Sequence, residues 1–203
     1  MSMMSTLAPA IPRWRQSLQT LIIAPRDKAT TAFGGVALLV AFGDALTKQI
    51  AMTLVPASGT TLGVLPERIR LLPVMNDQAA FGIGLGTYTW EINVIVTVAT
   101  VLLIMRVCRD LAAVDPWAPR ILGLLSGAAL GNLISLTLSP AGVPDFIAIT
   151  LTGGREIIMN FADIAAYLGL ALMGRLVWSI LKAMKQAREY GPQARRARLM
   201  GGD

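Results

Sequence analysis

Four long apolar segments constrain this chain more than any other feature. They lie at about residues 31–55, 85–105, 121–138 and 161–181. An α-helix rises about 1.5 Å per residue, so about twenty apolar residues cross a hydrocarbon core of about 30 Å. The composition agrees, because 54% of the residues are hydrophobic and 15% are charged, whereas soluble domains carry about 25% charged residues. We therefore expect an α-helical integral membrane protein with four transmembrane helices.

The positive charges outside these segments predict the orientation. Of the Lys and Arg residues there, thirteen lie in the N-terminal tail, the second loop and the C-terminal tail, against three in the other two loops. Because Lys and Arg accumulate on the cytoplasmic side, we expect both termini in the cytoplasm. The chain then divides into an N-terminal tail or interfacial helix (1–30), a membrane domain (31–181) and a basic cytoplasmic tail (182–203).

Two loop regions carry strand signals. Residues 56–86 are rich in glycine and proline and contain the strand-like run RIRLLPVM, which predicts a small extracytoplasmic β element. Between the third and fourth spans, FIAITL and REIIM flank a pair of glycines. This pattern predicts a β-hairpin.

Missing residue types limit the chemistry that is open to the chain. It has no histidine and a single cysteine, Cys108, which excludes the usual zinc sites and the Ser-His and Cys-His forms of catalysis. The net charge of +6 lies mainly beside the apolar segments and does not alternate with exposed aromatics, so we expect no nucleic-acid partner. Carboxylates remain as the groups that could drive hydrolysis.

Two aspartates flank the predicted hairpin. Asp145 follows the third span in GVPDFIAI, and Asp163 lies near the start of the fourth in MNFADIA. A hairpin would fold Asp145 back toward Asp163. At close range, charge repulsion and burial would raise one pKa, leaving one carboxyl protonated and the other able to take a proton from water. In the alternative interpretation, Asp163 merely caps a helix and Asp145 is an ordinary loop residue.

A further pair of charges lies inside the first span. Asp44 and Lys48 are four residues apart and therefore share one helix face. A charge deep in a bilayer costs about 2.5–3.5 kcal/mol on insertion scales. We expect the two side chains to pair and to face protein or water.

Five short motifs resemble those of lipoprotein signal peptidase (signal peptidase II), a family of four-span aspartyl proteases of bacterial inner membranes. GDALTK is similar to the family's D-x-x-T-K, NDQAAFG to N-x-G-A-A-F, and GAALGNLI to G-G-A-L-G-N-L-I. VPDFI is similar to V-x-D-F, and MNFAD to F-N-x-A-D. The motifs follow the family's order, and the resemblance runs from about Phe42 to Leu181.

The resemblance implies an endopeptidase that removes the signal peptide from diacylglyceryl-modified prolipoproteins, cutting just before the lipidated cysteine. Asp145 and Asp163 would be catalytic, without metal or cofactor. The enzyme would be a multi-pass protein of the bacterial inner membrane, in contact with membrane lipids, with its active site at the outer face, and we expect a monomer. The implied supporting or substrate-binding residues are Asn76, Asn132, Asn160, Asp44, Lys48, Gly131 and Ala162.

The chain departs from the family pattern at three positions. Ser135 and Leu136 stand where the family has Asp and Arg after G-N-L-I, and Gln78 replaces the glycine of N-x-G-A-A-F. Leucine cannot donate a hydrogen bond, and Arg155 is a candidate for the missing guanidinium. These departures keep a second hypothesis open, in which a non-catalytic relative binds lipid or partner membrane proteins on the same scaffold.

Overall fold

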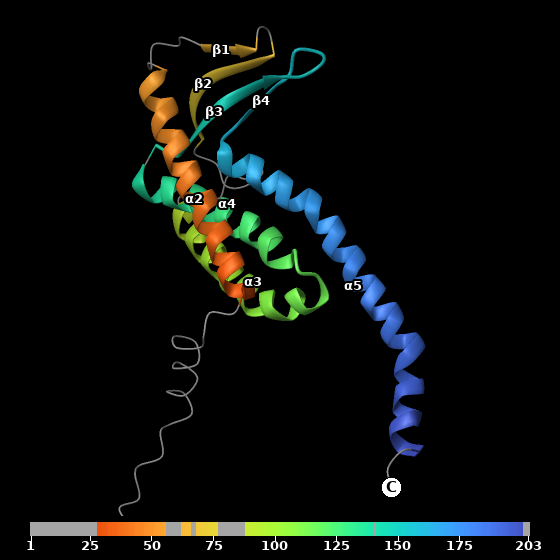
Figure 1. The fold of residues 1–203 in the computed structure, drawn as a ribbon. Helices are drawn as coiled ribbons and strands as arrows, with labels where there is room; N and C mark the ends of the chain where they lie inside the picture. Colours follow the sequence, from red (N-terminus) through yellow and green to blue (C-terminus); the bar gives the residue numbers. More distant parts are fainter. Residues whose placement is uncertain (1–27, 56–61, 66–67, 77–87, 140, 201–203) are drawn as a thin grey trace, which may run out of the picture.

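A computed structural model describes residues 28–55, 62–65, 68–76, 88–139 and 141–200. The helices are α2 (Lys28–Leu54), α3 (Thr89–Val114), α4 (Ala118–Leu138) and α5 (Phe161–Met200), and the strands are β1 (Leu62–Leu65), β2 (Ile69–Asn76), β3 (Val143–Thr150) and β4 (Glu156–Met159). In this part of the chain, four helices are long and apolar enough to cross a membrane. A sheet lies at one end of them (Figure 1). The predicted class, four membrane helices with a small β element, is confirmed.

Two helices, α3 and α5, have ends that differ from those of the predicted spans. Helix α3 begins at Thr89 and continues to Val114, so Arg106 and Arg109 are helical and do not lie in a loop. Helix α5 continues to Met200 through the predicted tail. Charged side chains ended our predicted spans, but Lys, Arg, Glu and Ala are good helix formers, and a helix does not stop where the membrane does. Most of the predicted N-terminal tail, residues 1–27, lies outside the described residues.

Glycines on α4 allow α2 to approach closely. A Cβ atom at Gly127 would lie 2.6 Å from the carbonyl oxygen of Ala37 and 2.7 Å from Cβ of Val40. A Cβ atom at Gly123 would lie 2.8 Å from the carbonyl oxygen of Phe33. Small residues give membrane helices this kind of contact, in which backbones touch because no side chain separates them.

We expect Gly127→Ala to lower the free energy of unfolding by about 1–3 kcal/mol, since the added methyl group meets backbone that cannot move aside alone. Unfolding of the purified protein in detergent would measure this. Gly174→Ala is the matched control, because nothing lies within 4 Å of a Cβ at Gly174, and it should be neutral or slightly stabilising. Equal stability of the two variants would contradict the close α2–α4 contact.

The sheet has the order β1-β2-β3-β4, and its neighbours are antiparallel. Strands β3 and β4 form the predicted hairpin, with Ile147 opposite Met159 and a turn in which Gly153 and Gly154 adopt positive φ angles of 91° and 79°. The sequence did not reveal that β2 also pairs with β3, placing Val74 opposite Asp145. The predicted β element and the predicted hairpin are therefore parts of one sheet.

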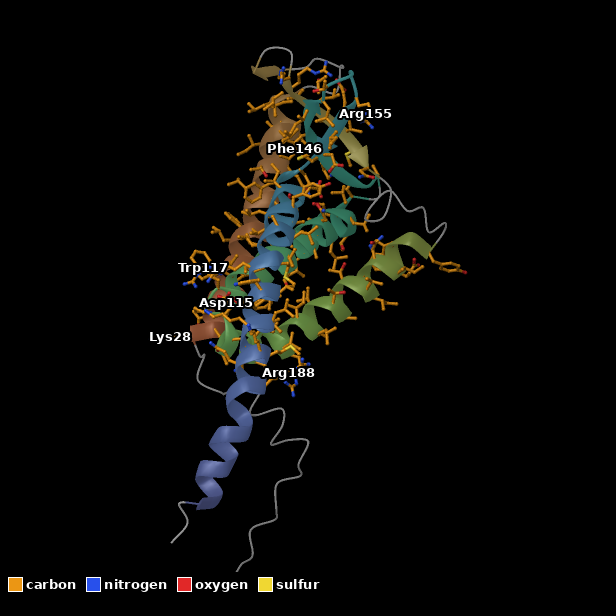
Figure 2. All side chains as sticks on the ribbon, turned by 90° about the vertical axis from the view of Figure 1, so that its right-hand side faces the viewer. Lys28, Asp115, Trp117, Phe146, Arg155 and Arg188 are labelled. Carbon is orange, nitrogen blue, oxygen red and sulfur yellow. The ribbon has the colours of Figure 1, made fainter. Side chains whose placement is uncertain are left out.

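Asp115 links the helices at the end of the bundle away from the sheet, and α5 continues beyond it (Figure 2). Its buried carboxylate accepts hydrogen bonds from the Trp117 backbone N–H (2.9 Å) and the Ser179 hydroxyl (2.8 Å), and Arg175 forms an ion pair with it (3.1 Å). The bond from the Trp117 N–H is the main reason why the pKa of Asp115 is lowered. These contacts join α5 to the turn between α3 and α4.

Candidate active site

Asp145 lies near the start of β3 and is 6% exposed. One carboxylate oxygen accepts a hydrogen bond from the side-chain amide of Asn76, the last residue of the neighbouring β2 (3.1 Å), and the other accepts one from the amide of Asn160 (2.6 Å). Burial raises the pKa of Asp145 above its ordinary value, the Asn76 hydrogen bond opposes that shift, and the charge of Asp163 adds to it. Asp145 is thus a buried carboxyl group whose protonated form is favoured by its surroundings.

Asn160 and Asp163 cap the N-terminus of α5 reciprocally. The side-chain oxygen of Asn160 accepts a hydrogen bond from the Asp163 backbone N–H (2.9 Å), and the Asp163 carboxylate accepts one from the Asn160 backbone N–H (3.0 Å). This arrangement satisfies N–H groups that a helix start leaves unpaired. The other oxygen of Asp163 accepts a hydrogen bond from Asn132 (3.2 Å). Asp163 is therefore a helix cap, as one interpretation proposed, and also part of a larger polar cluster.

Asn160 connects the two aspartates. Its amide nitrogen donates to Asp145, while its amide oxygen accepts from the backbone of Asp163. Asp145 and Asp163 also line one cavity of about 450 Å³, together with Asn76, Asn132 and Asn160. Two acidic side chains that are 18 positions apart in the sequence thus face the same space.

Lys48 sets the orientation of Asn132. Its ammonium group donates to Asp44 (2.6 Å), to the side-chain oxygen of Asn132 (2.8 Å) and to the hydroxyl of Ser135 (3.0 Å). An ammonium group can only donate, so Asn132 must present its oxygen to Lys48 and its NH₂ group to Asp163. The predicted pairing of Asp44 and Lys48 is confirmed, and the pair also orders a residue that contacts Asp163.

Asp44 joins α2 to the start of α5. One of its oxygens accepts a hydrogen bond from the backbone N–H of Ala162 (2.9 Å), which is another of the unpaired groups at that helix start. The carboxylate is fully buried because Gly131 makes room for it, since a Cβ atom at Gly131 would lie 2.8 Å from an Asp44 oxygen. The structure thus brings all nine predicted site residues into one connected cluster.

Sequence reasoning missed other residues around the cavity. Ser135 departs from the family pattern, yet it accepts a hydrogen bond from Lys48. Its position three residues after Asn132 on the same helix face was the available signal. The cavity lining outside the predicted set is Asn93, Thr97, Leu125, Ala128, Ala129, Leu133, Leu136, Val143, Ile158, Ala166 and Tyr167. Gln78 and the rest of the NDQAAFG motif after Asn76 lie outside the described residues.

Arg155 does not supply a guanidinium to the site. It lies exposed at the turn of the hairpin, well away from the start of α5 (Figure 2). Thr150 pairs with Glu156, so the turn lies five residues along β3 from Asp145. At about 3.3 Å per residue this is about 16 Å, farther than an arginine side chain reaches. Our suggestion that Arg155 replaces the missing arginine is wrong.

The family match and the sequence relatives of this chain agree on one family. Residues 36–180 match the family described as signal peptidase (SPase) II. The lipoprotein signal peptidase of Mycobacterium tuberculosis (strain ATCC 25618 / H37Rv) is 32% identical over 143 residues, covering 68% of this chain and 66% of that protein, just under two thirds of its length. The lipoprotein signal peptidase of Mycobacterium avium (strain 104) is 32% identical over 158 residues, covering 74% and 82%. A solved bacterial membrane enzyme, determined by the in meso method at 1.9 Å resolution, superposes with a TM-score of 0.61 and 26% identity over 70% of this chain and 89% of its own.

Proposed function

The chain belongs to the signal peptidase II family, and from this premise we propose that it removes the signal peptide from diacylglyceryl-modified prolipoproteins. The observation that carries the proposal is the pair of aspartates. Asp145 and Asp163 come from different elements, share Asn160 as a hydrogen-bond partner and line the same cavity. Such a pair can hydrolyse an amide without a metal or an imidazole.

In the proposed reaction, Asp163 is the base and Asp145 the acid. Asp163 lies at the positive end of α5 and accepts two N–H groups, which suits an ionised carboxylate. Burial favours the protonated form of Asp145. Asp163 takes a proton from water while the oxygen attacks the scissile carbonyl carbon, and the proton of Asp145 stabilises the carbonyl oxygen. The proton on Asp163 then passes to the leaving amine as the C–N bond breaks, and Asp145 recovers its own proton.

The position of the cavity fits a lipid-modified substrate. The sheet and the start of α5 lie at one end of the helices, and the start of α2 lies at the other (Figure 1). Residues of β2, β3 and the first turns of α5 line the cavity. The positive-inside rule assigns the sheet end to the outer face of the inner membrane. Large apolar side chains such as Leu38, Phe42 and Leu102 are exposed, as lipid contact requires. A substrate anchored by diacylglycerol would reach the aspartates sideways from the bilayer.

One observation favours the alternative, a non-catalytic relative. Leu136 lines the cavity where the family pattern has arginine, and it offers no hydrogen bond. The neighbouring substitution is better accommodated, because Ser135 accepts a hydrogen bond from Lys48. The family pattern has Asp and Arg at these two positions, and their charges cancel. Replacing both with Ser135 and Leu136 therefore leaves the local net charge unchanged.

Incubation of the purified protein with a diacylglyceryl-modified prolipoprotein tests the proposal. We expect cleavage to yield a product that begins with the lipidated cysteine. The same prolipoprotein without diacylglycerol is the control and should remain uncut. A wild-type protein that binds the modified substrate and leaves it intact would contradict the peptidase and favour the alternative.

We expect Asn76→Leu to move the alkaline limb of the pH profile of kcat/KM to higher pH. The Asn76 hydrogen bond lowers the pKa of Asp145, so its removal raises that pKa further. Activity in the proposed reaction requires the proton of Asp145 and is lost as pH rises through this pKa, so the loss occurs later in the variant. Thr150→Val is the control, because Thr150 lies on β3 with Asp145 but at the far end of that strand. An unmoved limb, or one moved to lower pH, would contradict the assignment of the proton.

A further inference from the structure

We propose that Asn93 and Thr97 of α3 bind the backbone of the signal peptide beside the scissile bond. This inference rests on the proposed function and adds a substrate-binding wall to it. Both residues are half-buried and line the cavity that contains Asp145 and Asp163. They come from a helix that contributes none of the predicted site residues.

The side of α3 that faces the other helices is polar near the start of the helix and apolar farther along it. Cys108 clusters with the buried side chains of Phe33 and Leu122 of the neighbouring helices, and Ile104 and Leu111 pack against this cluster. About two and three turns before Ile104, on the same helix face, the residues are Thr97 and Asn93. The face is therefore apolar where α3 meets protein and polar where it meets the cavity.

The polar part of α3 is also the part that packs least against the other helices. The helix diverges from the other three toward its Thr89 end (Figure 2). In the same stretch, Ile95, Val96 and Leu102 are exposed, as is expected of a lipid-facing surface. A polar side chain within a membrane span normally faces protein or a water-filled cavity because lipid offers it no partner. Asn93 and Thr97 thus occupy the part of α3 that is open to a ligand in the cavity.

A peptide in this cavity needs hydrogen-bond partners. Hydrolysis requires the segment beside the scissile bond to be accessible and therefore not helical, so its N–H and C=O groups lose their internal partners.

On α4, the cavity-lining side chains of Leu125, Leu133 and Leu136 are apolar and offer the peptide no hydrogen bond. An asparagine amide and a threonine hydroxyl can each donate and accept, so Asn93 and Thr97 can pair with both kinds of peptide group.

The test compares Asn93→Leu, Thr97→Val and Thr100→Val in cleavage of a diacylglyceryl-modified prolipoprotein. We expect Asn93→Leu to lower kcat/KM about tenfold and Thr97→Val about threefold, each mainly through a higher KM, because the contact exists before and during the reaction. Thr100→Val makes the same chemical change as Thr97→Val at an exposed position outside the cavity lining. It should behave as wild type.

The outcomes separate this inference from the function on which it rests. No cleavage by wild type would overturn both. Cleavage by wild type with unchanged KM in Asn93→Leu and Thr97→Val would overturn the inference alone. If Asn93→Leu does not fold, the matched threonine variants decide the question, and equal KM values for Thr97→Val and Thr100→Val would overturn the inference.

Discussion

Asp145→Asn and Asp163→Asn should each lower the cleavage rate of a diacylglyceryl-modified prolipoprotein by about 10³-fold, because acid–base groups contribute about 10²- to 10⁴-fold. Asparagine preserves the shape of aspartate and can still accept a hydrogen bond, but it neither takes nor gives the required proton. The two residues act as one unit, so the double variant should be no slower than the slower single variant.

The measurement is single-turnover cleavage, with thermal unfolding as a check that each variant is folded. Asp110→Asn is the matched control, since Asp110 is an exposed aspartate on α3 outside the site, and it should retain full activity. Cleavage that persists in both Asp145→Asn and Asp163→Asn would end the proposed mechanism. Retained activity in only one of them would show that a single carboxyl group is sufficient.

Lys48→Met should have the largest effect on stability, a loss of about 3–5 kcal/mol, because it leaves the charge of Asp44 buried without its partner. Lys48 is 4% exposed and Asp44 0%, so water cannot replace the ammonium group. Activity should fall as well, since the side-chain oxygen of Asn132 loses Lys48 and keeps only the amide of Asn160 as a donor, which weakens the orientation that presents its NH₂ group to Asp163. Unfolding in detergent and the cleavage assay measure the two effects.

The double variant Asp44→Leu/Lys48→Met separates stability from activity. It removes both charges, so we expect most of the stability to return. Activity should remain low, because Asn132 still lacks Lys48, and the Ala162 N–H has lost its acceptor. Lys182→Met, at an exposed position on α5, is the control for loss of a positive charge. Full activity in the double variant would show that Lys48 serves only to neutralise Asp44.

Features that depend on neighbours along the chain were predicted well. A membrane span is recognisable because each of about twenty consecutive residues must be compatible with lipid. The hairpin was recognisable because two strand-like runs flank Gly153 and Gly154, which take the positive φ angles of the turn. The pairing of Asp44 with Lys48 followed from helix periodicity and from the cost of an unpaired charge in a bilayer.

Features that depend on distant partners were not predictable from local patterns. Nothing near residue 76 indicated that β2 would pair with β3, yet this pairing brings Asn76 to Asp145. Arg155 could be excluded as a replacement for the family arginine only after the structure showed how far the hairpin turn lies from Asp145. Asn93 and Thr97 looked like ordinary residues of an apolar helix, because only the position of α3 decides which of its faces meets the cavity.

The sequence by itself determined the membrane class, the number of spans and, through the resemblance, the polar residues that gather at the site. The catalytic and binding roles of those residues remain predictions. The tertiary structure alone decided how they connect, as in the hydrogen bond between Asp44 and Ala162, which lie 118 positions apart. The physical reason is that buried polar groups must pair with one another where water is absent, and which groups meet depends on how the helices and the sheet pack.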